Sequence, residues 1–302
     1  MDTILSILSI YIFILIGFIA KKRLKKQIDD KTLILISIYI LQPTLVFWGL
    51  SGKTLDSNLL YTPLIYFLIL IIAILISVVL SRVFFSDRKN RIVFTISSLI
   101  SNTGNLGIPL GIVLFGEESI AYTSITNLAN LFFMYVFGVF FYSSGNMNFI
   151  ESIKSILKIP VIWFAILALL FSYFQIDLDD KIDKAIEMGA YSSIVIQLLI
   201  FGIYLANVKL KTIDYKLIFL SLNVKFILLP IVAMITLFFI DIPNFVKAII
   251  FLQIALPLAV NNVNLSALYD CKPQSVTALV LFSSILFIGF IFVDIFLLKF
   301  LY

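Results

Sequence analysis

Two stretches of the sequence combine helix-breaking residues with side-chain amides. The first, SNTGNLGIPLG at residues 101–111, holds three glycines, a proline, two asparagines and a threonine. The second begins at Pro257 and holds asparagines at positions 261, 262 and 264. An amide carries hydrogen-bond donors and acceptors that must be satisfied when the group is buried. A pocket for a polar solute uses such groups, so these stretches are the first candidates for a binding site.

Lys225 adds a positive charge inside an apolar stretch. It lies about 12 residues from the predicted inner end of that stretch, roughly 18 Å at 1.5 Å per residue, so reaching the membrane surface would strain its side chain. The ammonium is then either a counter-charge for an anionic substrate or a group that neutralises the broken helices. Helices that restart after a break also present free N–H groups and partial positive charge. These features predict a small organic anion, a carboxylate, as the substrate.

The sequence offers little for catalysis. It has no histidine and a single cysteine, Cys271, which excludes an intrachain disulfide and a cysteine metal cluster. No pair of acidic residues lies deep in an apolar segment, so we expect no enzyme, no metal site and no cofactor. Asp294, near the outer end of the last apolar segment, is expected at the membrane–water interface. Coupling to Na⁺ or H⁺ remains open.

The composition indicates an all-α polytopic membrane protein. Of the 302 residues, 62% are hydrophobic and 13% are charged, whereas soluble domains have about 25% charged residues. Apolar segments long enough to cross about 30 Å of hydrocarbon recur along the whole chain. The predicted transmembrane segments are residues 3–20, 31–50, 59–81, 92–116, 119–142, 153–174, 185–207, 213–240, 244–268 and 274–299. Because the basic residues lie in the loops, the net charge of +5 does not indicate nucleic-acid binding.

The loop charges orient the ten predicted segments. Sixteen lysines and arginines fall in the odd-numbered loops and four in the even-numbered loops. The positive-inside rule therefore predicts cytoplasmic odd loops, with both termini outside the plasma membrane. Cys271 then lies on the reducing side.

The ten segments divide into two halves of five, residues 1–148 and 149–302. A shift of about 148 residues places Pro109 in segment 4 opposite Pro257 in segment 9. Halves with an odd number of spans must be inverted in the membrane, and paired breaks in such repeats mark a substrate site. Non-helical backbone at that depth is tolerated only inside protein or along a wet cavity.

The candidate substrate-binding residues come from the two breaks and from two neighbouring segments. They are Asn102, Thr103, Gly104, Asn105, Pro109, Pro257, Asn261, Asn262, Asn264, Lys225, Asn127 and Asn130. The last two are three residues apart and share one helix face. They line the cavity or bond between helices; the sequence leaves both open.

With these residues in view, the chain resembles the auxin efflux carrier family, which includes plant PIN-type carriers and bacterial malate or malonate permeases. The resemblance covers essentially the whole chain. Four motifs carry it: KTLILISIYILQPTLVFWGL, SSLISNTGNLGIPLGIVLFGEES, NVKFILLPIVAMI and QIALPLAVNNVNLSALYDCKPQSVTALVLFSSILF. The sequence departs from the pattern at Tyr191-Ser192, where many members have a proline. The short loop between segments 5 and 6 favours a compact prokaryotic-type permease.

The resemblance implies a fold and a mechanism. The fold is that of the bile-acid symporters: ten helices in two inverted repeats, with broken helices 4 and 9 that cross. Helices 1, 2, 6 and 7 would form a scaffold that often dimerises, and helices 3–5 and 8–10 a moving transport domain. The expected function is secondary transport of an organic anion by elevator-type alternating access.

Two other transport functions remain alternatives. A sodium-coupled symporter of the bile-acid carrier type could hold Na⁺ with unwound carbonyls and Asn, Thr or Ser oxygens. A channel fits the paired breaks less well. An intramembrane enzyme or a receptor has the least support.

Overall fold

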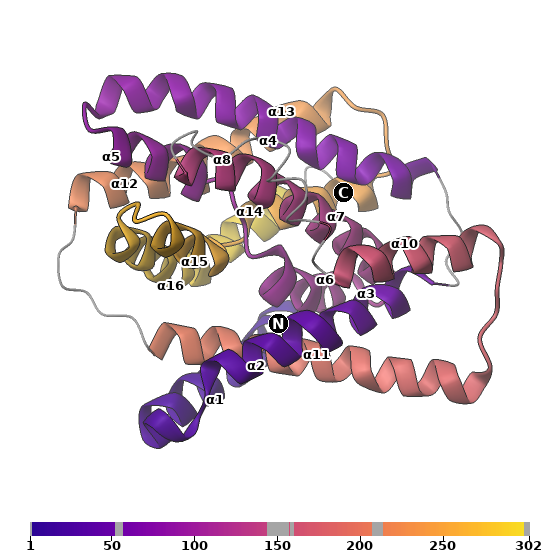
Figure 1. Ribbon diagram of the computed structural model, residues 1–302. Coiled ribbons are helices and arrows are strands. Elements are labelled where there is room, and N and C mark those ends of the chain that lie inside the picture. The colour runs from indigo at the N-terminus through magenta and orange to yellow at the C-terminus, as the bar shows by residue number, and fades with distance from the viewer. Residues whose placement is uncertain (1, 52–56, 144–156, 158–159, 207–213, 299–302) are drawn as a thin grey trace. The chain divides into compact units, whose positions relative to one another are not determined.

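The structure is a computed structural model that describes residues 2–51, 57–143, 157, 160–206 and 214–298 (Figure 1). Over these residues it is almost entirely helical and contains no β-strand. The helices are α1 (Asp2–Leu24), α2 (Asp30–Ile36), α3 (Gln42–Leu50), α4 (Ser57–Phe84), α5 (Arg88–Ile92), α6 (Ile108–Phe115), α7 (Ser119–Phe133), α8 (Val139–Tyr142), α10 (Pro160–Tyr173), α11 (Asp180–Ala206), α12 (Tyr215–Asn223), α13 (Leu229–Phe238), α14 (Asn244–Ala255), α15 (Asn261–Leu268) and α16 (Pro273–Leu298).

Six of the described helical stretches are long and apolar enough to cross a membrane: Thr32–Leu50, Ser57–Phe84, Ser119–Tyr142, Asp180–Ala206, Tyr215–Phe238 and Pro273–Leu298. Shorter apolar helices span Thr103–Phe115, Pro160–Tyr173 and Asn244–Ala255. The prediction of a helical, multi-pass membrane protein is confirmed. The arrangement as ten inverted spans stays a prediction, and its boundary at residues 148 and 149 lies outside the described residues.

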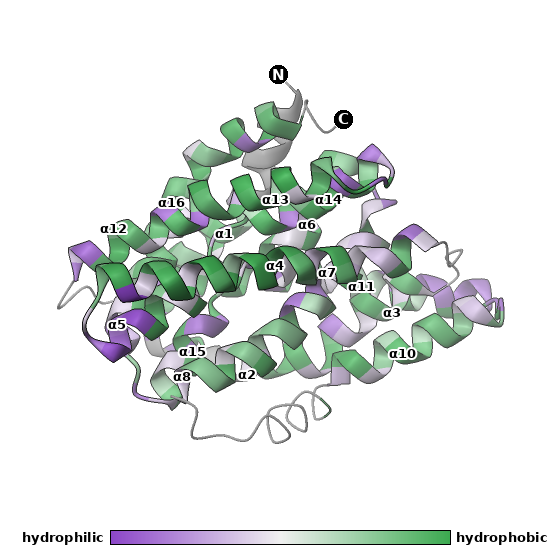
Figure 2. Ribbon diagram, turned by 90° about the horizontal axis from the view of Figure 1, so that it is seen from above, coloured by the Kyte–Doolittle hydropathy of each residue, from purple (hydrophilic) through white to green (hydrophobic). Residues whose placement is uncertain are grey.

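Helix α4 shows how the sequence suits these helices to lipid. It carries large apolar side chains on its exposed surface, including Leu64, Leu75 and Val83. Figure 2 shows hydrophobic residues along most of α4 and hydrophilic residues at α5. Lipid solvates exposed apolar side chains that water would not, so this surface needs no protein partner.

Wider π-helical turns interrupt several of the helices. They are η2 (Ser37–Leu41), η3 (Val93–Ser97), η4 (Thr103–Gly107), η5 (Met134–Gly138) and η6 (Val224–Leu228). A π-turn leaves backbone groups out of the regular ladder and often marks a functional site. Two of them, η3 and η4, flank the break in the 101–111 region.

The chain forms two compact units, each described here by itself. The first contains residues Met1–Leu60, Gly104–Leu128 and Ser155–Asn207. In it α1 and α11 run side by side (Figure 1). A Cβ added at Gly202 would lie 1.9 Å from the carbonyl oxygen of Ile14, so the two backbones touch at that glycine. Helix α11 runs without interruption through Tyr191, in keeping with the absence of proline there.

The second unit contains residues Tyr61–Thr103, Ala129–Lys154 and Val208–Tyr302. Helix α16 packs against α12, α14 and α15 in this unit. Helix α14 has no exposed residue from Ala248 onward and ends at Ala255, within the interior of the unit. A helix that ends inside protein needs partners for its last carbonyl groups. Those partners define the candidate site.

Candidate functional site

The two sequence breaks lie against each other inside the second unit. The first is the stretch between η3 and η4, and the second is the stretch between α14 and α15. The N–H of Asn102 donates to the carbonyl oxygen of Pro257 at 2.8 Å, and the N–H of Ala259 donates to that of Ile100 at 2.9 Å. Ser101 and Leu258 form the antiparallel bridge between these two bonds. We call this paired backbone, residues 100–102 and 257–259, the crossing.

Asn130 supports the first strand of the crossing. Its amide nitrogen donates to the carbonyl oxygen of Ser101 at 2.9 Å and to Oγ1 of Thr103 at 3.0 Å. Its amide oxygen accepts a bond of 3.1 Å from the hydroxyl of Tyr66, which is fully buried. Asn130 therefore bonds between helices.

Asn262 supports the crossing from the second break. Its amide nitrogen lies 3.2 Å from the carbonyl oxygens of both Ile100 and Ala259. Its amide oxygen accepts from the hydroxyl of Tyr142 at 3.4 Å, and that hydroxyl also bonds Ser97 Oγ at 2.6 Å. The side chain is fully buried, so its amide replaces the helical bonds that the break removes.

Lys225, on η6, is buried and its side chain donates hydrogen bonds at the crossing. Its side chain is 0% exposed, and its Nζ donates to Oγ of Ser101 at 2.5 Å and to the carbonyl oxygen of Ile254 at 2.8 Å. Snorkelling to a membrane surface does not describe this side chain. The ammonium neutralises carbonyl groups at the end of α14, where a cation is electrostatically favoured.

Asn102 differs from the other amides of the crossing. Its side chain is 4% exposed, and its Nδ2 has no hydrogen-bond partner among the described residues. Its backbone N–H is already used by Pro257. Because a buried NH₂ group without a partner costs free energy, this amide is the donor of the crossing that remains available to a ligand.

The structure distributes the other predicted site residues between the two units. Pro257 is buried in the crossing, Asn261 is half-buried and Asn264 is exposed, all in the second unit. Gly104, Asn105, Pro109 and Asn127 belong to the first unit. There, a Cβ on Gly104 would lie 3.1 Å from Oδ1 of Asn127, so the glycine allows close packing on that amide.

Asp294 was expected at the interface, and the structure corrects that expectation. Its side chain is 3% exposed, and its Oδ2 has no hydrogen-bond partner among the described residues. Phe287, Ile291 and Asp294 follow one another at helical spacing and are all buried. This three- and four-residue spacing along one face of α16 was the sequence signal that could have placed Asp294 inside the protein.

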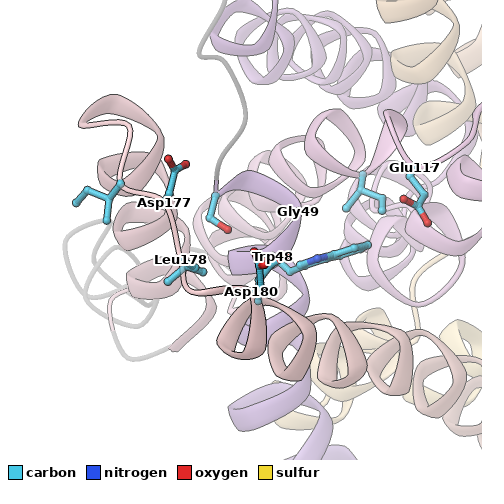
Figure 3. A pocket seen from close by; sticks show the side chains of 10 residues that line it. Trp48, Gly49, Glu117, Asp177, Leu178 and Asp180 are labelled. Carbon is cyan, nitrogen blue, oxygen red and sulfur yellow. The ribbon is translucent and has the colours of Figure 1, made fainter.

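The first unit contains an acidic cavity that sequence reasoning missed (Figure 3). It measures about 500 Å³ and includes Glu117, Asp177, Asp180 and Asp183 in its lining, with Trp48 on one wall. The carboxylate of Glu117 accepts a hydrogen bond from the hydroxyl of Tyr191. Four carboxylates repel an organic anion, so this cavity does not suit the predicted substrate. Its lining comes from three separate segments of the sequence, residues 48–51, 117–120 and 176–183, so no single local motif indicates it.

Ion pairs connect loops of the second unit. Lys89 pairs with Asp270, and Lys272 pairs with Asp87, each at 3.2 Å. Partial burial raises the pKa of Asp87, but hydrogen bonds from the Asn90 N–H and from Lys272, with the charge of Lys272, lower that pKa to below its usual value. The neighbouring Cys271 is a buried free thiol, and burial raises its pKa to about 11.

Comparison with known proteins gives two matches. A family profile described as "Membrane transport protein" matches residues 2–155 and 146–293. An uncharacterized transporter of Methanocaldococcus jannaschii is 25% identical over 281 residues, which are 89% of this chain and 89% of the relative. Both matches extend over both breaks and over Lys225.

Proposed function

The chain belongs to the membrane transport protein family, and from this premise we propose that it is a secondary transporter of small organic anions, carboxylates in particular, in the plasma membrane. Membership confirms the family resemblance found in the sequence, since this is the family of the auxin efflux carriers. The names of the family and of the relative indicate a transporter and not an enzyme. The substrate class and the mechanism are the proposal.

The observation that carries the substrate class is the unpaired amide of Asn102. The other two buried amides of the crossing, from Asn130 and Asn262, are used by backbone carbonyls and hydroxyls. Asn102 alone among the three leaves an NH₂ donor without a partner in the described protein. An NH₂ donor suits a carboxylate oxygen, and the N-terminus of α15 beside the crossing adds partial positive charge.

The predicted site residues then take two roles. We assign ligand contact to Asn102, Thr103 and Asn261, which all belong to the second unit. We assign a structural role to Lys225, Asn130 and Asn262, whose hydrogen bonds stabilise the crossing. Asn127 packs against Gly104. Pro257 and Pro109 lie at the two breaks, where each proline removes a backbone donor. Asn264, which is exposed, would contact substrate as it approaches.

For the mechanism we propose elevator-type alternating access, as the family resemblance implies. Predicted spans 1, 2, 6 and 7 would form a fixed scaffold that dimerises with a second copy of the chain. Predicted spans 3–5 and 8–10 would move against this scaffold. The grouping of predicted spans 1, 2, 6 and 7 in the first unit, and of spans 3, 8, 9 and 10 in the second, supports this proposal. Spans 4 and 5, by contrast, are each divided between the two units. The break in the first half of the sequence forms its backbone hydrogen bonds with the break in the second half, through Asn102 and Pro257 and through Ala259 and Ile100.

Transport assays on the purified protein in liposomes test the proposal. We expect saturable uptake of one or more labelled mono- or dicarboxylates, accelerated by unlabelled substrate inside the liposome. Asn102→Ala should lower uptake at least tenfold, because it removes the free donor. Asn223→Ala is the matched control, since that amide bonds only the carbonyl of Phe219 in its own helix. Absence of transport for every organic anion would overturn the proposal.

The same assay separates the alternatives. Replacing Na⁺ by choline on both sides should leave uptake unchanged; a strict sodium requirement would favour the sodium-coupled symporter. Flux that does not saturate and shows no counterflow would favour a channel.

A further inference from the structure

Helix α16 buries a carboxyl group in the part of the second unit that holds the crossing. Ser283, on this helix, accepts the N–H of Leu258 at 3.1 Å, which attaches α16 directly to the crossing. Asp294 lies three turns further along the same helix, on its buried side. Its Oδ2 has no hydrogen-bond partner among the described residues. A buried carboxylate with an oxygen that accepts no hydrogen bond is costly, whereas a protonated carboxyl group carries no charge.

Lys225 is the buried cation on the element that packs against α16 through Phe226. The rings of Phe226 and Phe290 stack with centroids 4.6 Å apart and planes 11° apart, which fixes η6 against α16. Lys225 adjoins Phe226 in sequence, and Asp294 lies one turn beyond Phe290, so the stacked pair brings the two charges to the same region. We therefore expect an attraction between the ammonium and the carboxylate. Their side chains are almost fully buried, so this attraction is weakly screened.

No other charged group of the packed elements takes part. The titratable residues on the helices packed against α16, apart from Lys225, are Tyr215 and Lys216 of α12 and Lys247 of α14. Of these titratable residues, Lys225 is the fully buried charge, whereas Lys216 is exposed and Lys247 is half-buried. Ionisation of Asp294 therefore acts mainly on the Lys225 ammonium. That ammonium donates hydrogen bonds to Ser101, in the crossing, and to the carbonyl oxygen of Ile254.

We propose that Asp294 is the proton-binding site that couples substrate transport to H⁺. A proton from water forms the O–H bond of the Asp294 carboxyl group and cancels its charge; release of that proton restores the carboxylate. The ionised carboxylate attracts the Lys225 ammonium and weakens its hold on Ser101 and Ile254. Protonation removes this attraction and leaves Lys225 bound to the crossing. This inference rests on the proposed transport function, because it names the ion that is coupled to it.

The test compares two modes of transport for one variant, Asp294→Asn. Proton coupling is needed for accumulation driven by a pH gradient but not for exchange of labelled for unlabelled carboxylate at equal pH. We expect Asp294→Asn to keep exchange within about threefold of the wild type and to lose accumulation driven by the gradient. A purely structural aspartate would lower both modes together. Gradient-driven accumulation at the wild-type level in Asp294→Asn would overturn the proposal.

Two control variants test whether the effect of Asp294→Asn is specific to that carboxyl group. Asp241→Asn removes an exposed carboxylate between α13 and α14, and should keep both modes. Ser284→Ala removes a buried hydroxyl that bonds only Val280 in its own helix, and should also keep both. Loss of gradient-driven accumulation in Asp241→Asn would assign the proton to a different carboxylate and overturn the proposal.

A second measurement follows proton binding without transport. Infrared difference spectra of the purified protein between acid and alkaline pH should show the carbonyl stretch of a buried carboxylic acid, absent in Asp294→Asn and kept in Asp241→Asn. An unchanged carbonyl signal in Asp294→Asn overturns the proton site even where transport is observed. If the wild type carries no carboxylate, the proposed function fails and the infrared result alone decides whether Asp294 binds a proton. Should Asp294→Asn not fold, Asp294→Glu replaces it, and the midpoint of the carbonyl signal should shift.

Discussion

The buried amides of the crossing differ in what their atoms contact. The Asn130 amide donates to the Ser101 carbonyl and the Thr103 hydroxyl, and the Asn262 amide donates to the carbonyls of Ile100 and Ala259. Asn102 donates only its backbone N–H, and its side-chain NH₂ has no partner in the described protein. Asn130 and Asn262 thus stabilise the fold, whereas Asn102 offers a hydrogen-bond donor to a ligand.

This division predicts opposite effects for two alanine variants. Asn130→Ala leaves the Ser101 carbonyl and the Tyr66 hydroxyl with an unmet partner, and should lower the free energy of unfolding by about 1–3 kcal/mol. Asn102→Ala removes no hydrogen bond of its side chain and should leave that free energy unchanged while it lowers transport. Thermal unfolding in detergent and uptake into liposomes measure the two effects. Equal destabilisation by both variants would contradict the division.

The buried charges predict a rescue. Lys225→Met removes the bonds to Ser101 and Ile254 and leaves the buried carboxyl group of Asp294 without a neighbouring cation, so it should lower the free energy of unfolding. The double variant Lys225→Met, Asp294→Asn removes both charges and should recover part of the lost stability. The melting temperatures of the single and double variants in detergent give this comparison. A double variant less stable than Lys225→Met would show that the two side chains do not interact.

At the scale of helices, contact through glycine fixes α1 against α11. A Cβ at Gly202 would lie 1.9 Å from the Ile14 carbonyl, whereas a Cβ at Gly289 of α16 meets nothing within 4 Å. Gly202→Ala should therefore push the helices apart and destabilise the protein by about 1–3 kcal/mol. Gly289→Ala is the matched control, and it should be neutral or stabilising by up to about 1 kcal/mol because alanine favours helix. Similar melting temperatures for Gly202→Ala and the wild type would contradict the close contact.

The loop ion pairs predict a pH dependence. The pKa of Asp87 is lowered in the folded protein, so its carboxylate contributes stability above its unfolded pKa of about 4. This contribution is lost as the pH falls through the lower, folded pKa. Asp87→Asn should therefore flatten the stability profile between about pH 5 and pH 3. Melting temperatures across this range, with Asp241→Asn as control, provide the measurement; equal slopes for Asp87→Asn and the wild type would exclude a role for the pair with Lys272.

How far the sequence predicts these elements depends on how local the cause is. Glycine, proline and asparagine act on their own backbone, so the breaks at 101–111 and after Pro257 were predictable from the chain alone. The bonds of Asn130 to Ser101 and of Lys225 to Ile254 join segments that are distant in sequence, and composition does not specify such partners. The position of Asp294 near the end of an apolar segment favours the interface, but its place on the buried face of α16 puts it inside the protein.

For the whole molecule, the loop charges predict an orientation that cysteine labelling can check. The natural Cys271 is buried with a pKa raised to about 11, so it forms little thiolate and reacts slowly with maleimides. New cysteines at the exposed positions Lys25 and Lys181 in a Cys271→Ser background should label from opposite sides. We expect an impermeant maleimide to reach Lys181→Cys in intact cells and Lys25→Cys only after permeabilisation. The reverse pattern would invert the topology.

The crossing also dictates an order of assembly. Asn102 bonds Pro257, 155 residues later in the chain, so during synthesis the first break enters the membrane long before its partner exists. Until residues 257–259 emerge, the N–H of Asn102 lacks the Pro257 carbonyl and the carbonyl of Ile100 lacks the Ala259 N–H, and lipid cannot replace either partner. We therefore expect the nascent first half to be recognised by chaperones or membrane proteases. Synthesis of the second break then determines whether the first break is stabilised or degraded.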